Sequence, residues 1–163
     1  MNPDRTNSVF KVSESSFIWN TAGSDTSPGS GGAIYCVGFN SGLKLEGCRF
    51  NNNRARGGGL GGSIAILNHA GLRLKNSTAM GNVAEGKGSL GGFLYARLSA
   101  PILFQNTRIE KCTAAAGAGA LAIVASSSIA LDAVEIARCS AGGIGGGAIL
   151  VDEGSEAHLI GRC

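Results

Sequence analysis

Apolar and polar side chains alternate in short runs throughout the chain, and the runs recur at a regular interval. Apolar residues occupy the first and third positions of the segments 43–45, 72–74, 102–104 and 129–131. Because residues i and i+2 share one face of a strand, this alternation predicts half-buried β-strands. Further apolar runs follow glycine, at Gly31, Gly61, Gly91, Gly119 and Gly146.

A second motif marks the same interval. An asparagine or cysteine follows an apolar residue by three positions and precedes an alanine by two, in copies that start at Phe17, Phe50, Ala79, Ile109 and Ile136. The alanines are 33, 29, 30 and 27 residues apart, and the glycines 30, 30, 28 and 27. Two signals that share one period indicate stacked copies of a single unit.

The sequence therefore predicts an all-β fold, a right-handed parallel β-helix of about five coils of 27–33 residues. Each coil is expected to hold about three strands of three to five residues with tight bends between them. Residues 1–8 are interpreted as a polar N-terminal segment, and 9–163 as a single repeat domain from a longer solenoid. A β-sandwich is the alternative, but it does not require the same motif at the same phase.

The asparagine or cysteine of the second motif is expected at a bend, in equivalent positions of successive coils. An asparagine there bonds to neighbouring backbone and tolerates left-handed φ, and stacked asparagines bond to one another. We interpret these positions as structural rather than catalytic. The predicted ladder consists of Asn20, Asn53, Asn82, Cys112 and Cys139.

Alternation within the glycine-led runs divides their residues between an inner and an outer face. The inward pairs are expected to be Ile34/Cys36, Ile64/Ile66, Leu94/Ala96, Ala122/Val124 and Ile149/Val151. The outward set then includes Phe93, Tyr95, Leu121, Ile123 and Leu150. Exposed apolar patches of this kind mark partner surfaces, so this face is a candidate protein interface. A covering loop or the opposite assignment of inside and outside are equally weighted alternatives.

Charge and composition narrow the classes of function. The net charge of +3 is spread over 163 residues without a dense Lys/Arg cluster, which argues against a nucleic-acid partner. No apolar stretch reaches the length of a transmembrane helix, and the first residues lack the apolar core of a signal peptide. A candidate binding stripe for a polyanion, such as an acidic polysaccharide, comprises Lys44, Arg49, Arg73, Lys75 and Arg108, and a solvated strand face is the favoured alternative.

Catalytic and metal-binding residues are not expected. Only 11 acidic residues are present, and the positions equivalent to Glu46 in later coils hold Lys75, Gln105 and Asp132 rather than further acids. Chemistry on polysaccharides requires clustered carboxylates. The five cysteines form no CxxC pair, and no metal-ligand spacing or cofactor motif is present. The chain is therefore interpreted as not being an enzyme.

The motifs resemble the FxxN and GGAI repeats of the chlamydial polymorphic membrane proteins. The matches are Phe17-x-x-Asn20, Phe50-x-x-Asn53, and the Gly-Gly-Ala-Ile runs that begin at Gly31 and Gly146. The resemblance implies a β-helix of the pectin-lyase-like superfamily, in a passenger segment that is often adhesive and lies at the cell surface. We expect a non-catalytic structural or binding segment that acts through contacts with a protein partner or with neighbouring coils. The alternatives are a carbohydrate-binding or carbohydrate-active β-helix and a scaffold subunit.

Overall fold

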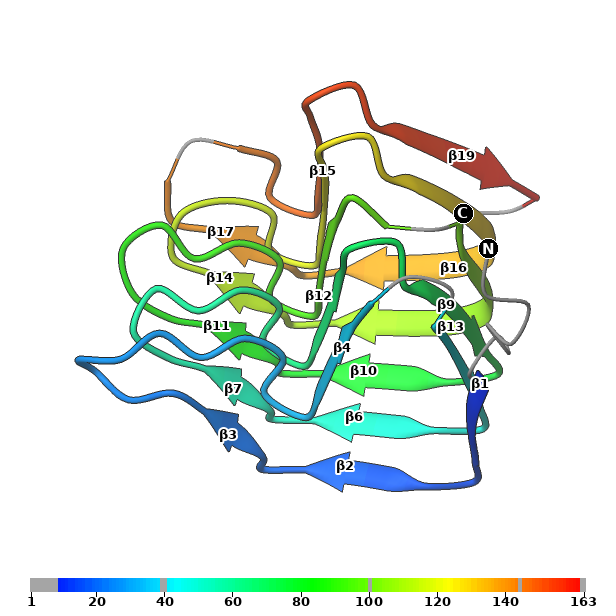
Figure 1. The fold of residues 1–163 in the computed structure, drawn as a ribbon, viewed down its shortest axis with the longest axis horizontal. Coiled ribbons are helices and arrows are strands. Elements are labelled where there is room, and N and C mark those ends of the chain that lie inside the picture. The colour runs from blue at the N-terminus through cyan, green and yellow to red at the C-terminus, as the bar shows by residue number, and fades with distance from the viewer. Residues whose placement is uncertain (1–8, 39–40, 100, 144, 162–163) are drawn as a thin grey trace, which may run out of the picture.

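The computed structural model describes residues 9–38, 41–99, 101–143 and 145–161, which form a parallel β-solenoid (Figure 1). The predicted all-β architecture of about five stacked coils is confirmed, and the described residues contain no helix. The predicted segment 1–8 and the C-terminal Cys163 lie outside the described residues.

The largest sheet supplies two faces of the solenoid. Its first face consists of β1 (Val9–Ser13), β5 (Gly42–Glu46), β9 (Gly71–Lys75), the first parts of β13 (Ile102–Glu110) and β16 (Ser128–Ala137), and β19 (Glu156–Ile160). Its second face consists of β2 (Ser16–Ile18), β6 (Arg49–Asn51), β10 (Thr78–Met80) and the later parts of β13 and β16. The long strands β13 and β16 therefore join both faces at one corner.

Two further sheets complete each coil. One contains the two-residue strands β3 (Thr21–Ala22), β7 (Arg54–Ala55), β11 (Val83–Ala84), β14 (Thr113–Ala114) and β17 (Ser140–Ala141). The other contains β4 (Ile34–Val37), β8 (Ile64–Leu67), β12 (Leu94–Arg97), β15 (Leu121–Val124) and β18 (Ile149–Val151). The sequence predicted about three strands per coil, and the additional one is the short strand that holds the alanine of the Asn/Cys-x-Ala motif.

The register between coils reproduces the period of the sequence. Along one inward column of the first face, Val12 pairs with Leu45, Leu45 with Leu74, Leu74 with Phe104, and Phe104 with Leu131. These steps of 33, 29, 30 and 27 residues equal the spacing of the motif alanines. Like residues therefore stack on like along the axis, about 4.8 Å apart.

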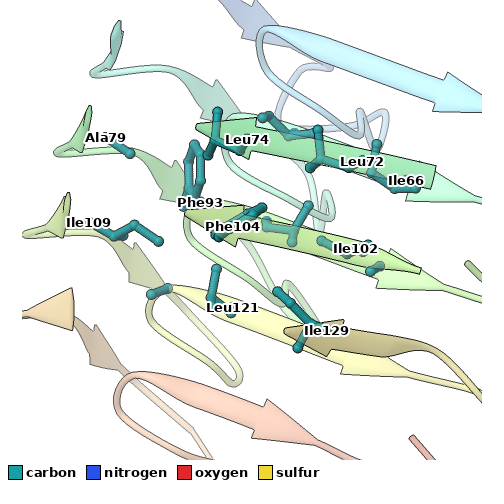
Figure 2. Close-up of a cluster of buried hydrophobic side chains, with 14 of the residues drawn as sticks. Ile66, Leu72, Leu74, Ala79, Phe93, Ile102, Phe104, Ile109, Leu121 and Ile129 are labelled. Atoms are coloured by element: carbon teal, nitrogen blue, oxygen red, sulfur yellow. The ribbon is translucent and has the colours of Figure 1, made fainter. Parts of the chain in front are cut away.

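Apolar columns from three faces meet in one continuous core. Figure 2 shows Leu74, Phe93 and Phe104 together in the interior. The Phe17 and Phe50 rings are parallel with centroids 4.9 Å apart, and the Phe50 and Phe93 rings meet edge to face at 5.6 Å. These aromatic contacts add to the stabilisation that burial of apolar surface provides.

The predicted outward positions of Leu121 and Ile123 are wrong, because both side chains are fully buried in the core. Leu121 pairs in register with Leu94, which lies three residues after Gly91. The residue equivalent to Gly91 in the next coil is therefore Ala118 rather than Gly119. Ala118 adopts the left-handed conformation, with φ 56°, that Gly91 adopts in the preceding coil, with φ 68°. A one-residue shift in register moves every side chain of a strand to its other face.

Phe93 is also buried in the core rather than outward, because it lies at the bend before β12, where strand alternation does not apply. Tyr95 does lie on the outer face, but it is only 5% exposed. Tyr95 belongs to a buried cluster with Ala118, Ala122 and Val124, and Leu60, Leu67, Leu90 and Leu150 pack against that cluster. The chain therefore covers much of the apolar face that the sequence offered as a protein interface.

Candidate functional site

Three cations form a column on the outer surface of the first sheet face. Lys11 on β1 pairs in register with Lys44 on β5, and Lys44 pairs with Arg73 on β9. The residues that flank each of them in its strand point inward, so the three charged side chains project outward and are exposed. Neighbouring strands lie about 4.8 Å apart, which places the three cations in one line along the axis. We call Lys11, Lys44 and Arg73 the basic column.

The basic column borders a depression of about 450 Å³. The next outward column contributes Glu46 and Lys75, whose side chains form an exposed ion pair at 3.5 Å. Four cations and one carboxylate thus surround the depression, with a net charge of +3, which equals the net charge of the whole chain.

The described residues do not neutralise the cations of the basic column. Within the described residues, none of the three forms an ion pair or a side-chain hydrogen bond, unlike Arg54, Arg56, Arg108 and Arg138. Aligned like charges repel one another, and a bound anion relieves that repulsion. The positive charge does not continue onto β13, because Leu103 pairs with Arg73 and Gln105 pairs with Lys75.

The predicted stripe of five basic residues is divided by the structure. Lys44, Arg73 and Lys75 lie together, whereas Arg49 and Arg108 belong to the second face, around the corner. Arg108 lies 3.3 Å from Glu110 and 3.6 Å from Glu135, so its charge is compensated. The stripe as predicted is therefore not one continuous surface.

Lys11 is the residue of this site that the sequence analysis did not single out. The segment Val9–Ser13 has the same alternation as the later strands, with Lys11 between two apolar residues. Extending the repeat one coil toward the N-terminus from Lys44 would have found it.

The predicted ladder is present as a series of hydrogen bonds along the axis. Oδ1 of Asn53 accepts from the backbone N–H of Asn20 at 3.0 Å and from its Nδ2 at 2.8 Å. Oδ1 of Asn82 accepts from the same two groups of Asn53, at 3.0 and 3.1 Å. Asn53 Nδ2 also donates to the Phe17 carbonyl at 2.9 Å. Since Asn53 and Asn82 are fully buried, these bonds satisfy polar groups that water does not reach.

The two cysteines continue the ladder in the later coils. Cys112 Sγ lies 3.8 Å from Asn82 Nδ2 and accepts the Asn82 backbone N–H. Cys139 occupies the equivalent position one coil further on, since Thr113 and Ser140 pair in register, and its Sγ donates to the Ala137 carbonyl at 3.4 Å. The left-handed backbone expected at the ladder falls instead on the residue immediately before it. These preceding residues are Trp19, Asn52, Gly81, Lys111 and Arg138.

Replacing Asn53 by leucine should lower the free energy of unfolding by about 3 kcal/mol, because several buried partners lose their hydrogen bonds at once. Asn51→Leu is the matched control, since the Asn51 side chain forms no hydrogen bond with a described residue. Urea denaturation followed by circular dichroism measures both. Equal midpoints for the two variants would contradict a stabilising role of the ladder.

Comparison of the chain with family models, with curated proteins and with solved structures gives no match. Among the residues that the structure describes, no helix is long and apolar enough to cross a membrane. The same residues contain no group of three or more His, Cys, Asp or Glu side chains that could hold a metal ion. The class of protein that the fold defines is thus a parallel β-solenoid repeat protein.

Proposed function

We propose that this solenoid is a non-catalytic binding segment that holds an acidic polysaccharide along the basic column. The observation that carries the proposal is the in-register line of Lys11, Lys44 and Arg73, none of which is neutralised by a described residue. A polymer with regularly spaced acidic groups matches a row of cations set by strand spacing better than a single small anion does.

The shape of the surface supports an extended ligand. The depression lies across three adjacent strands rather than within one coil. Each cation is attached to a strand that is hydrogen-bonded to its neighbours, so binding orders only side chains. The buried positions of Phe93, Leu121 and Ile123 remove the competing apolar interface as the first choice.

The wider setting that we propose is a large surface or adhesin-like protein. Its support is the recurrence of FxxN and GGAI-like motifs at one period, now seen to build stacked coils. We also propose that the chain belongs to the polymorphic membrane protein repeats and to the pectin-lyase-like superfamily, and that it lies at the cell surface. A scaffold that contacts neighbouring coils or another protein is the second candidate, favoured by the exposed Tyr35 and Val37 at the N-terminal end of the β4-containing sheet.

Reversing two charges of the basic column tests the binding function. The double variant Lys44→Glu/Arg73→Glu should bind polygalacturonate or heparin at least about tenfold more weakly than the wild type, as measured by isothermal titration calorimetry. Wild-type affinity should fall as salt is raised, because the charges are exposed and screened. The polymer should keep its length during the titration, as measured by size-exclusion chromatography.

Arg49→Glu/Lys87→Glu is the control, because it changes the net charge equally at two exposed sites outside the basic column. Its affinity should remain within about threefold of the wild type. Equal losses in both double variants would show attraction by net charge alone. Shortening of the polymer would contradict the non-catalytic assignment.

A further inference from the structure

The depression beside the basic column has a second edge, whose chemistry differs from that of the first. Ser13, Glu46 and Lys75 pair in register on β1, β5 and β9, and their side chains are exposed on the same outer surface. We call these three residues the mixed column. Each lies two residues after a member of the basic column, about 6.6 Å further along its strand. The depression is thus lined by three cations on one edge and by a hydroxyl, a carboxylate and a cation on the other.

The carboxylate of Glu46 is held in position through one of its oxygens and keeps the other available. Its Oε1 lies 3.5 Å from Lys75 Nζ and accepts a hydrogen bond from Asn76 Nδ2 at 3.4 Å. Within the described residues, Oε2 has no partner, and the side chain is 55% exposed. Oε2 is therefore free to accept a hydrogen bond from a bound molecule, and an ionised carboxylate donates none.

We propose that Glu46 is a specificity-determining residue, which selects a polyuronate with free ring hydroxyls over other polyanions. This selectivity rests on the proposed function, since it acts on the polymer that the basic column holds. Each sugar unit of a polyuronate carries both a carboxylate and hydroxyl groups. A chain that places carboxylates on the basic column can therefore present hydroxyls of the same units to the mixed column. A hydroxyl that donates to Glu46 Oε2 forms a charge-assisted hydrogen bond, which is stronger than a neutral one.

Polyanions without hydrogen-bond donors gain nothing from this carboxylate. Polyphosphate and the phosphate backbone of DNA present only acceptor oxygens, so they meet Glu46 as a like charge. Glu46 lies on β5, the middle of the three strands, and a polymer that contacts Lys11 and Arg73 together passes beside it. The cations attract every polyanion, whereas Glu46 attracts one class and repels the other, and specificity is the difference between the two affinities.

A glutamine variant tests this selectivity by isothermal titration calorimetry on the full chain, with polygalacturonate and polyphosphate as the two ligands. Glu46→Gln should bind polyphosphate at least about threefold more tightly than the wild type, because one repulsive charge is lost. It should bind polygalacturonate no more tightly than the wild type, because the weaker hydrogen bond to the neutral amide offsets the lost repulsion. Glu153→Gln is the control, since it removes an exposed acid outside the depression, and its ratio of the two affinities should equal that of the wild type.

A modified ligand tests the hydrogen bond itself. Acetylation of the ring hydroxyls of polygalacturonate removes the donors and keeps the carboxylates. The wild type should bind the acetylated polymer at least about threefold more weakly than the native polymer, and Glu46→Gln should show a smaller loss. Comparing the two losses separates the Glu46 contact from the bulk of the acetyl groups.

Three outcomes count against these expectations, and they differ in what they overturn. Equal losses on acetylation in the wild type and in Glu46→Gln would overturn the selectivity of Glu46. A gain of the same factor for polygalacturonate and polyphosphate in Glu46→Gln would also overturn it, and would leave the proposed function intact. Binding of neither polymer by the wild type would overturn the proposed function, and the selectivity with it.

Discussion

Replacing Ile123 by glutamate is expected to abolish the folded state. Ile123 is fully buried in the main core, and its neighbours in register are Ala96 and Val151. No cation faces this site from those columns, so a carboxylate would be either charged without a partner or neutral with unsatisfied hydrogen bonds. The cost is expected to be of the order of the total stability of a small domain, about 5–15 kcal/mol. Circular dichroism should show loss of β-structure at 25 °C.

Tyr35→Glu is the matched control for that substitution. Tyr35 lies in the same sheet, in the outward column, and is 56% exposed. Its replacement should change the free energy of unfolding by no more than about 0.5 kcal/mol. A folded Ile123→Glu variant with an unchanged urea midpoint would show that β15 has its inner and outer faces reversed.

Replacing Gly62 by alanine should destabilise the solenoid by about 3 kcal/mol or more, through contact between backbones of successive coils. A Cβ atom at Gly62 would overlap the carbonyl oxygen of Gly92 and would lie 2.6 Å from the carbonyl carbon and oxygen of Val83. All three are backbone atoms, so no side-chain rotation relieves the overlap. Gly32 and Gly92 have equivalent surroundings, which indicates why glycine recurs at this bend.

Gly42→Ala provides the comparison for Gly62→Ala. A Cβ atom there would be 3.6 Å from Val9 Cγ2, an ordinary contact, and Gly42 does not have a positive φ. Its urea midpoint should stay close to that of the wild type. Equal midpoints for the Gly42 and Gly62 variants would contradict the close stacking of coils at this bend.

The period of the fold was predictable because every coil must place its bend and its inward residues at the same phase. Asn53 and Asn82 could be assigned to one ladder from spacing alone, since a buried amide needs a partner and the adjacent coil supplies one. The alternating segments around Leu45 and Leu74 likewise determined the first face and the orientation of Lys44 and Arg73.

The outer face of the β12 and β15 strands was not predictable in the same way. The pattern used a glycine to mark the start of each apolar run, but in the fourth coil the left-handed residue at that position is Ala118. The sequence analysis therefore started this run one residue late, at Gly119. Leu60 and Leu90, which pack against the cluster that contains Tyr95, lie in loops whose path the periodicity does not specify. Arg108 differs from Arg73 in its ion pair with Glu135, an acid of the next coil whose position the sequence pattern did not indicate.

The central claim, that an acidic polymer lies along the basic column, is tested most directly by nuclear magnetic resonance. A heparin-derived or polygalacturonate oligosaccharide is titrated into the ¹⁵N-labelled chain while backbone amide shifts are recorded. The account predicts that the largest shifts occur in β1, β5 and β9, around Lys11, Lys44 and Arg73, and decline beyond β13. Largest shifts around Arg49 on the second face, or no saturable shift at low salt, would contradict it.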